Sequence, residues 1–199
     1  MSLTVVKIGG SLCGSARLDR LLEQLAGETK APLVLVAGGG PFADAVRQVQ
    51  AAMPFDDVLA HRLALDAMTH LAEILATRHP RLTAVGDRAG VTAALRQGKL
   101  PIWHPAELRA GHPDITESWE VTSDSLAAWL AAELGADRLV LLKSIDASAD
   151  STPAALAAAD VVDAHFPRYA ARFAGSIMVA GPSSDDRLAA LFSIPCEAS

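Results

Sequence analysis

The chain has 199 residues, of which 51% are hydrophobic and 20% are charged. That length suits one well-buried core, and that composition excludes an intrinsically disordered chain. The formal net charge of −6 provides no overall positive field for nucleic acid or an anionic membrane. No apolar run reaches the ~18 residues of a membrane span. We therefore expect a globular protein that binds neither nucleic acid nor a membrane.

The first two predicted strands both stop at glycines. Val5–Ile8 runs into Gly9, Gly10 and Ser11, and Val34–Ala37 runs into Gly38, Gly39 and Gly40. Helical spacing of apolar residues follows each run, at 15–28 and 41–53. Such a junction presents backbone N–H groups and the positive end of a helix to an anion. Glycine turns without a function are the alternative, but Lys7 beside the first junction favours phosphate binding.

The middle of the chain predicts a long helix, a strand, a short helix and a second strand, at 59–78, 82–85, 88–97 and 100–103. The long helix is apolar enough to be deeply buried or packed against another subunit, and we favour the second. Asp87 has the position of an N-cap of the short helix. The irregular segment that follows, 104–121, is long for a compact chain, and such loops are commonly functional or mobile.

The last third of the chain opens with Thr122, Ser123, Asp124 and Ser125, which begin a clear helix at 126–134. Thr122 or Ser123 has the residue type of an N-cap. Strands are then expected at 138–143, 161–162 and 176–179, and helices at 154–159, 165–172 and 185–191. Because strands and helices alternate from end to end, we expect an α/β fold with a mostly parallel sheet and helices on both faces.

The cysteines and the N-terminus bear on the compartment. Cys13 and Cys196 form no pattern with histidines that suits a zinc site or a disulfide framework. The N-terminus leads directly into a predicted strand, without the basic and apolar segments of a signal peptide. We therefore expect a protein of the reducing cytoplasm.

Ligands of open α/β sheets bind beyond the carboxyl ends of the strands. The segments with this position are Lys7–Ser11, Gly38–Gly40 and Lys143–Asp146, and the helix start at Thr122–Ser125 has N–H groups that can face the same crevice. Together they offer glycine backbones, two lysines, hydroxyl groups and carboxylates. Phosphoryl transfer needs mainly positioning and neutralisation of phosphate charge. The set therefore predicts a phosphoryl-transfer site, and no spacing in the chain demands a general base.

Four motifs in this order, V-V-K-I-G-G-S-L, L-V-A-G-G-G-P-F-A-D, T-S-D-S-L-A and L-V-L-L-K-S-I-D, resemble the amino acid kinase superfamily. The resemblance spans almost the whole chain and implies a three-layer αβα sandwich. It implies a single domain over 1–199, with an acceptor-binding part at about 1–120 and a part that binds ATP and Mg²⁺ at about 121–199. The shortness of the chain implies a reduced C-terminal lobe.

The resemblance also implies roles for single residues. Lys7 is expected to stabilise the transferred phosphoryl group, and Asp124 to orient the catalytic lysines and reach the metal, possibly through water. The residues implied in ATP binding are Gly9, Gly10, Ser11, Lys143, Ser144, Asp146 and Arg168. Gly38, Gly39 and Gly40 are implied in lining the acceptor site, which Thr122 and Ser123 border.

Other candidates rest on position alone. His61 and Arg62 open the long helix, where they would reach the acceptor phosphate or form a solvated helix start. Trp119 is either a ligand contact or a core or lid residue. His104 and His112 are expected to be structural, and Asp44 an ordinary helix-face charge.

One motif of the larger superfamily members is missing. They carry a second phosphate-binding lysine near G-G-M-x-x-K, whereas this chain reads V-D-A-H-F-P-R-Y at 162–169. Arg168 or Lys143 is the expected replacement. The same departure motivates an alternative, a nucleotide- or oxyanion-binding member without turnover.

The short length, Trp103 and Trp119, S-W-E-V-T-S-D-S and V-D-x-x-F-P-R-Y are similar to the small kinases of methanofuran biosynthesis. That resemblance implies aminomethylfuran-methyl phosphate as acceptor and a diphosphate as product. Glu120, Asp124 or Trp119 would then face the ammonium group of the acceptor. Isopentenyl phosphate and a nucleoside monophosphate are the alternative acceptors. The family resemblance and the apolar long helix imply a homodimer or a larger homo-oligomer.

Overall fold

The computed structural model describes residues 2–27, 31–148 and 150–193 of the chain. Its centre is a six-stranded sheet in the order β3-β4-β2-β1-β5-β6, and every neighbouring pair of strands is parallel. The strands are β1 (Thr4–Ile8), β2 (Leu33–Ala37), β3 (Leu82–Val85), β4 (Leu100–Trp103), β5 (Arg138–Leu142) and β6 (Ser176–Ala180).

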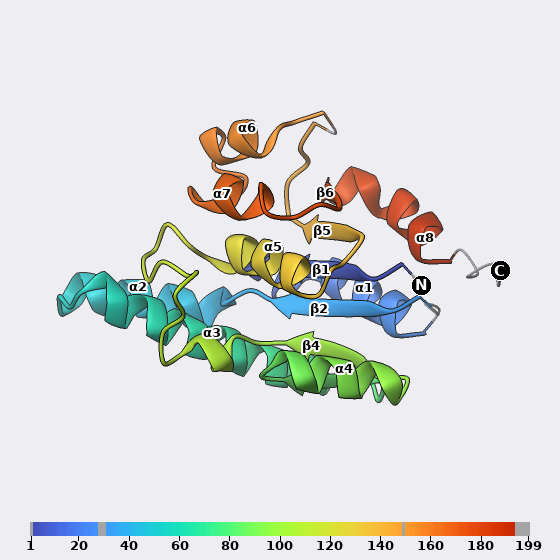
Figure 1. The fold of residues 1–199 in the computed structure, drawn as a ribbon, viewed down its shortest axis with the longest axis horizontal. Helices are drawn as coiled ribbons and strands as arrows, with labels where there is room; N and C mark the ends of the chain where they lie inside the picture. The colour runs from blue at the N-terminus through green and yellow to red at the C-terminus, as the bar shows by residue number, and fades with distance from the viewer. Residues whose placement is uncertain (1, 28–30, 149, 194–199) are drawn as a thin grey trace.

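Helices cover both faces of this sheet, so the predicted three-layer sandwich with a parallel sheet is confirmed (Figure 1). One face carries α4 (Arg88–Arg96), α5 (Ser123–Glu133), α6 (Pro153–Ala158) and α7 (Phe166–Ala170). The other carries α1 (Ala16–Gly27), much of α3 (Asp57–Ala76) and α8 (Asp185–Ser193). The helix α2 (Gly40–Ala52) packs against α3, and 3₁₀ turns occur at Gly10–Leu12, Ala106–Leu108 and Pro182–Ser184.

The central strand β1 has the sequence TVVKI and is apolar at Val5, Val6 and Ile8. All five of its residues are buried, because helices cover both of its faces. Val5 belongs to the core beneath α5, whereas Val6 and Ile8 belong to the core above α1. Since side chains alternate along a strand, Lys7 points to the same face as Val5, toward α5.

The strand order creates a crevice between β1 and β5. The chain leaves β1 through α1 toward β2 on one side, and leaves β5 through α6 and α7 toward β6 on the other. Such a point of reversal is where ligands bind in open parallel sheets. Ile8 lies opposite Leu142 in the register, so the segments that follow these two residues begin side by side.

The predicted elements agree with the structure, with one exception. The strand expected at 161–162 is wrong: Val161 and Val162 form a bend after α6. Asp160 takes a left-handed conformation with φ 52°, and the Val161 N–H donates to the Leu156 carbonyl, which closes the helix. Val162 is apolar because its side chain fills the core as part of a loop.

Two predictions fall partly or wholly outside the described residues. Glu28, the expected end of the first helix, and Cys196 are not described. Cys13 is a free thiol, and no helix within the described ranges is long and apolar enough to cross a bilayer.

Candidate phosphoryl-transfer site

Two lysines and one aspartate meet at the carboxyl ends of β1 and β5. The Lys7 ammonium lies 2.8 Å from Oδ1 of Asp124, and the Lys143 ammonium donates to Oδ2 at 2.7 Å. Lys7 and Asp124 are each only 4% exposed. The three residues come from β1, the first turn of α5 and the residue after β5. The sheet order therefore unites positions that are up to 136 residues apart in sequence.

Burial and charge act against each other in this cluster. Burial would raise the pKa of Asp124, but the two ammonium groups and their hydrogen bonds outweigh it and hold the pKa below its usual value. Burial and the repulsion from Lys7 lower the pKa of Lys143 to about 8, against the attraction of Asp124. Asp124 is therefore ionised at neutral pH, and Lys143 is the group that loses its charge on the alkaline side.

The two glycine junctions touch one another beside this cluster. A Cβ atom on Gly10 would lie 2.7 Å from the backbone nitrogen of Gly40, so only glycine allows the two segments to approach this closely. Gly40 has φ +51° and begins α2. The expectation that both junctions border one site is thus met in the geometry.

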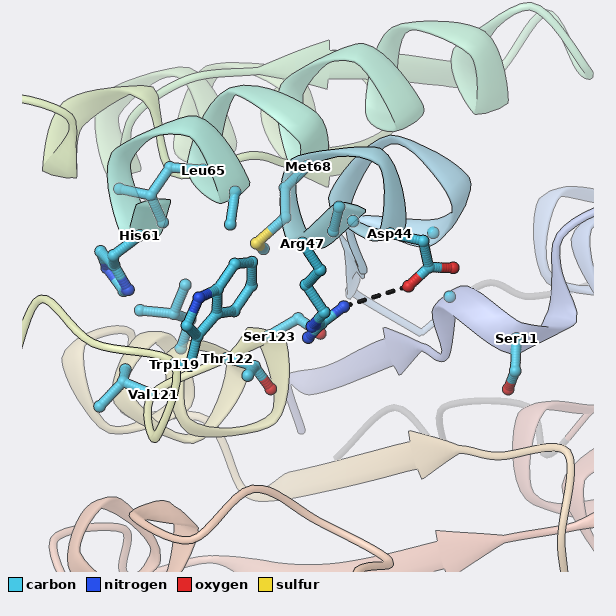
Figure 2. Close-up of a pocket in the computed structure, with 16 residues that line it drawn as sticks. Ser11, Asp44, Arg47, His61, Leu65, Met68, Trp119, Val121, Thr122 and Ser123 are labelled. Atoms are coloured by element: carbon cyan, nitrogen blue, oxygen red, sulfur yellow. Dashed lines mark hydrogen bonds and ion pairs between the residues drawn. The ribbon is translucent and has the colours of Figure 1, made fainter. Parts of the chain in front are cut away.

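A pocket of about 270 Å³ opens next to the junctions (Figure 2). That size suits a small molecule rather than a polymer. Its lining comprises Gly10, Ser11, Gly39, Gly40, Ala43, Asp44, Arg47, His61, Ala64, Leu65, Met68, Trp119, Val121, Thr122, Ser123 and Leu126. The predicted acceptor residues Gly39, Gly40, His61, Trp119, Thr122 and Ser123 are among them. Gly38 lies just below, where its N–H donates to the Ile8 carbonyl at 3.0 Å.

The loop that carries Trp119 is attached to α2 and α3 at three places. The indole N–H of Trp119 donates to the Gln50 side chain at 2.7 Å. His61 Nδ1 lies 3.1 Å from the Ser118 carbonyl. Arg62 binds the Glu117 carboxylate with two hydrogen bonds, of 2.7 and 3.1 Å. Arg62, expected at the acceptor, therefore lies behind the loop and does not line the pocket.

His61 is buried, with 2% exposure, and burial lowers its pKa despite the neighbouring Ser118 carbonyl. Its ring is therefore neutral at neutral pH. His104 and His112 behave as expected of structural residues: His104 lies 3.2 Å from the Thr69 hydroxyl, and His112 makes an edge contact with Trp129.

Sequence reasoning missed Arg47. Asp44 has the exposure and the i,i+3 ion pair expected of a helix-face charge, and both residues also line the pocket from α2. They pair at 3.1 Å, and the Arg47 guanidinium lies 4.3 Å above the Trp119 ring. The helical period offered a signal, because Ala43, Asp44 and Arg47 share the face of α2 that begins at the glycine junction.

The residues expected at ATP, apart from Arg168, follow β1 and β5. The Ser11 hydroxyl donates to the Ser144 hydroxyl at 3.0 Å, which joins the loops after β1 and β5. Asp146 accepts hydrogen bonds from the Ser183 hydroxyl and N–H at 2.7 and 3.0 Å, and these lower its pKa. Arg17, which sequence reasoning missed, donates to the Lys143 and Gly181 carbonyls and pairs with Asp185.

The 162–169 segment contacts the acceptor-side loop. Asp163 accepts hydrogen bonds from the N–H groups of Thr122 and Ser125, both at 3.0 Å, and from both hydroxyls. Asp163, rather than the Thr122 side chain, therefore caps α5. Arg168, expected at ATP, lies 3.5 Å from the Thr116 hydroxyl. The predicted replacement for the missing lysine thus faces the 112–122 loop.

Two further expectations concern charge partners. Glu120 is paired with His165 at 3.1 Å and is not part of the pocket lining. Both carboxylate oxygens of Asp124 contact ammonium groups. Within the described ranges, no group of three or more His, Cys, Asp or Glu side chains is arranged to hold a metal ion.

Comparison with known proteins identifies the family. The model of the amino acid kinase family matches residues 2–159, which is well over half of the chain. The chain belongs to the amino acid kinase family. The match includes both glycine junctions, Lys7, Asp124 and Lys143, which confirms the superfamily expected from the motifs.

The chain is also similar in sequence to a kinase whose substrate is named. The chain is 32% identical, over 124 residues, to [5-(aminomethyl)furan-3-yl]methyl phosphate kinase from Methanocaldococcus jannaschii. The match covers 62% of this chain and 57% of that kinase. The predicted likeness to the small kinases of methanofuran biosynthesis is therefore confirmed as a likeness.

Solved structures support the fold. Uridylate kinase from Archaeoglobus fulgidus matches with a TM-score of 0.66 at 15% identity, over 96% of both chains. UMP kinase from Ureaplasma parvum matches with 0.66 at 17% identity, over 92% of this chain and 90% of the other. Aspartate kinase from Synechocystis matches with 0.68 at 17% identity, over 92% of this chain and 38% of the other. All three have the amino acid kinase fold.

Proposed function

We propose that this protein is an ATP-dependent kinase that converts a small phosphate monoester into a diphosphate. The Lys7–Asp124–Lys143 cluster at the switch point of the sheet carries the proposal. With both lysines protonated the cluster has one net positive charge. It lies beside touching glycine junctions, whose backbone groups suit phosphate oxygens.

The chemistry requires no general base from the protein. An oxygen of the acceptor phosphate forms a bond to the γ-phosphorus of ATP, and the bond from that phosphorus to the β–γ bridging oxygen breaks. ADP leaves with the electron pair of that bond, and the acceptor becomes a diphosphate. A phosphate monoester is already ionised near neutral pH, so no proton has to be removed.

Each residue of the cluster has a distinct task in this proposal. Lys7 neutralises charge on the transferred phosphoryl group, and Lys143 contacts the nucleotide phosphates from the other side of the crevice. Asp124 holds both ammonium groups in place, through an ion pair of 2.8 Å with Lys7 and a hydrogen bond of 2.7 Å from Lys143. Asp124 would hold the Mg²⁺ that is supplied with ATP through water, because both of its oxygens contact ammonium groups, and the ion would neutralise phosphate charge.

We further propose [5-(aminomethyl)furan-3-yl]methyl phosphate as the acceptor, for which the likeness to the M. jannaschii kinase is the main support. The pocket is compatible, since Trp119 presents a flat ring and Leu65 and Met68 give an apolar wall. Asp44, which is exposed and pairs with Arg47, is the carboxylate of the pocket lining that an ammonium group can reach, whereas Glu120 and Asp124 lie outside that lining. A homo-oligomer and a cytoplasmic location remain predictions.

A coupled ADP-release assay with MgATP tests the proposal. The acceptors compared are [5-(aminomethyl)furan-3-yl]methyl phosphate, isopentenyl phosphate and UMP. We expect turnover with the furan alone. Turnover with another acceptor would show that the proposed substrate is wrong but that the protein is still a kinase. ATP binding without transfer to any of the three acceptors would favour a non-catalytic binding protein. Lys7→Ala should abolish transfer, and transfer that survives in this variant would contradict the proposed site.

A further inference from the structure

Arg47 is the one lysine or arginine among the residues that line the pocket within the described chain. His61, the other basic residue of the lining, is neutral because burial lowers its pKa. Lys7 and Lys143 are already bound to Asp124 outside the lining. A phosphate group that enters the pocket would therefore meet a single exposed side-chain positive charge, that of Arg47.

The ion pair that holds Arg47 is weak. Its partner Asp44 lies 3.1 Å away, and the two side chains are 50% and 66% exposed. Exposed pairs of this kind contribute little to stability because water and salt screen them. A phosphate dianion offers shorter, charge-assisted and bidentate hydrogen bonds to a guanidinium group, so it competes well against Asp44.

Trp119 gives Arg47 a fixed surface on which to lie. The guanidinium sits 4.3 Å above the indole, whose N–H is held by Gln50 at 2.7 Å. The Gln50 amide in turn donates to the Phe55 carbonyl and the Asp57 carboxylate, both at 3.0 Å. Figure 2 shows the guanidinium reaching into the middle of the pocket, between Trp119 and Asp44. Stacking limits the orientations that the guanidinium must lose on binding an anion.

We propose that Arg47 binds the phosphate of the acceptor and that Asp44 is its competitor in the empty pocket. This inference rests on the proposed function and names the residue that selects a phosphorylated acceptor. The acceptor phosphate lies between Arg47, the N-terminus of α2 at Gly40 and the N-terminus of α5 at Ser123, all of which line the pocket. Arg47 touches the substrate in this arrangement, and Asp44 controls how readily the guanidinium is released.

The two residues make opposite predictions. Arg47→Gln removes the guanidinium group that binds the acceptor phosphate. The KM for the acceptor should therefore rise at least tenfold, with little change in the KM for ATP. Asp44→Asn removes the competitor, so the dissociation constant for a simple phosphate monoester such as methyl phosphate should fall several-fold. Arg47→Lys keeps the positive charge but loses the planar guanidinium group that forms paired hydrogen bonds. Its KM for the acceptor should lie between those of the wild type and Arg47→Gln. A role limited to pocket stability would weaken acceptor binding in both variants.

Direct binding separates this inference from the kinase assignment. Methyl phosphate, the smallest phosphate monoester, is titrated calorimetrically into the wild type, Arg47→Gln and Asp44→Asn, and thermal melts confirm that all three are folded. We expect affinity in the order Asp44→Asn, wild type, Arg47→Gln. That order, in a protein that proves to transfer no phosphoryl group, would uphold the inference while the proposed function fails. Equal affinities, or weakening in both variants, would overturn the inference even in an active kinase.

Discussion

At the scale of single residues, the candidate site depends on one buried carboxylate between two cations, of which Lys7 is buried and Lys143 is partly buried. Asp124 stabilises both Lys7 and Lys143, which would otherwise repel each other at close range. Because Lys143 has a pKa of about 8, the cluster is fully charged at neutral pH but loses a positive charge under mildly alkaline conditions.

The first prediction concerns the pH dependence. Lys143 is charged below its pKa, so kcat/KM for ATP, which reports the free protein, should fall as the pH rises through about 8. Bound phosphate groups favour the charged form and raise that pKa, so kcat should stay level to a higher pH. Rate measurements between pH 6.5 and 10 check both curves. Identical curves for kcat and kcat/KM would contradict this coupling, and Lys143→Gln should lose the step near pH 8.

The second prediction concerns Asp124→Asn. Removing the carboxylate removes the attraction that supports the charge of Lys143, so the pKa of Lys143 should fall further. We expect a loss of transfer of about 100-fold or more, the magnitude seen when a preorganised charge contact is removed. Breaking a buried ion pair should also cost about 3–5 kcal/mol of unfolding free energy. Asp66→Asn, which alters an exposed pair with Arg109, is the control and should be nearly neutral in both assays.

At the scale of elements, the ends of β1, β2 and α5 are fixed by close backbone contacts and by a cap from a distant segment. Gly10 touches Gly40, and Asp163 binds two N–H groups at the start of α5. Asp124 lies in that first turn of α5. The position of the Asp124 carboxylate therefore depends on contacts that no single element provides.

The third prediction tests the contact between the glycine junctions. Gly10→Ala would place a Cβ atom 2.7 Å from the Gly40 nitrogen, so the two segments must separate. We expect a lower melting temperature and a loss of transfer, because the phosphate-binding groups lose their spacing. Gly27→Ala is the matched control, since no atom lies within 4 Å of a Cβ at that position. An active, fully stable Gly10→Ala protein would show that the junctions need not touch.

The fourth prediction tests the cap of α5. Asp163→Ala removes the acceptor for the Thr122 and Ser125 N–H groups and should lower the unfolding free energy by about 1–2 kcal/mol. Asp163→Asn keeps one oxygen that can accept these hydrogen bonds, so its unfolding free energy should fall by less. Asp150→Ala changes an exposed carboxylate and provides the baseline. Chemical denaturation measures all three, and equal stability of the Asp163 and Asp150 variants would mean that the cap is dispensable.

At the scale of the whole molecule, α2, α3 and the turn between them carry an unusual share of exposed apolar side chains. Their exposure runs from 39% to 67%, and they are Phe42, Val49, Met53, Val58, Leu59 and Ile74. Exposed apolar surface on this scale commonly marks an interface with another protein. The surface is consistent with the homo-oligomer expected from the long apolar helix.

The fifth prediction is that the protein forms a dimer or a larger assembly through this surface. Light scattering should give at least twice the mass of a single chain. Met53→Lys, which places a charge on the most exposed of these residues, should shift the mass toward that of one chain. Ile145→Lys charges an apolar residue elsewhere, with 52% exposure, and should leave the mass unchanged. A single-chain mass for the unmodified protein would contradict the prediction.

The sequence by itself determined the layers of this protein and much of its chemistry. Burial on both faces makes the central strands continuous apolar runs, helices show their own period, and glycines mark where strands end. Lys7, both glycine junctions, Asp124 and Lys143 could therefore be selected as candidates. These are local signals, since each is set by the conformation and burial of a few neighbouring residues.

Only the tertiary structure decided which of these candidates meet. No local pattern encodes that β5 lies next to β1, yet this order brings Lys143 to the carboxylate that also holds Lys7. The packing of α2 against the 117–121 loop places Arg47 on Trp119, and the bend after α6 brings Asp163 to the start of α5. Such contacts depend on the simultaneous burial of distant segments, and for this reason the apolar pair at 161–162 predicts a strand although Val162 fills the core from a loop.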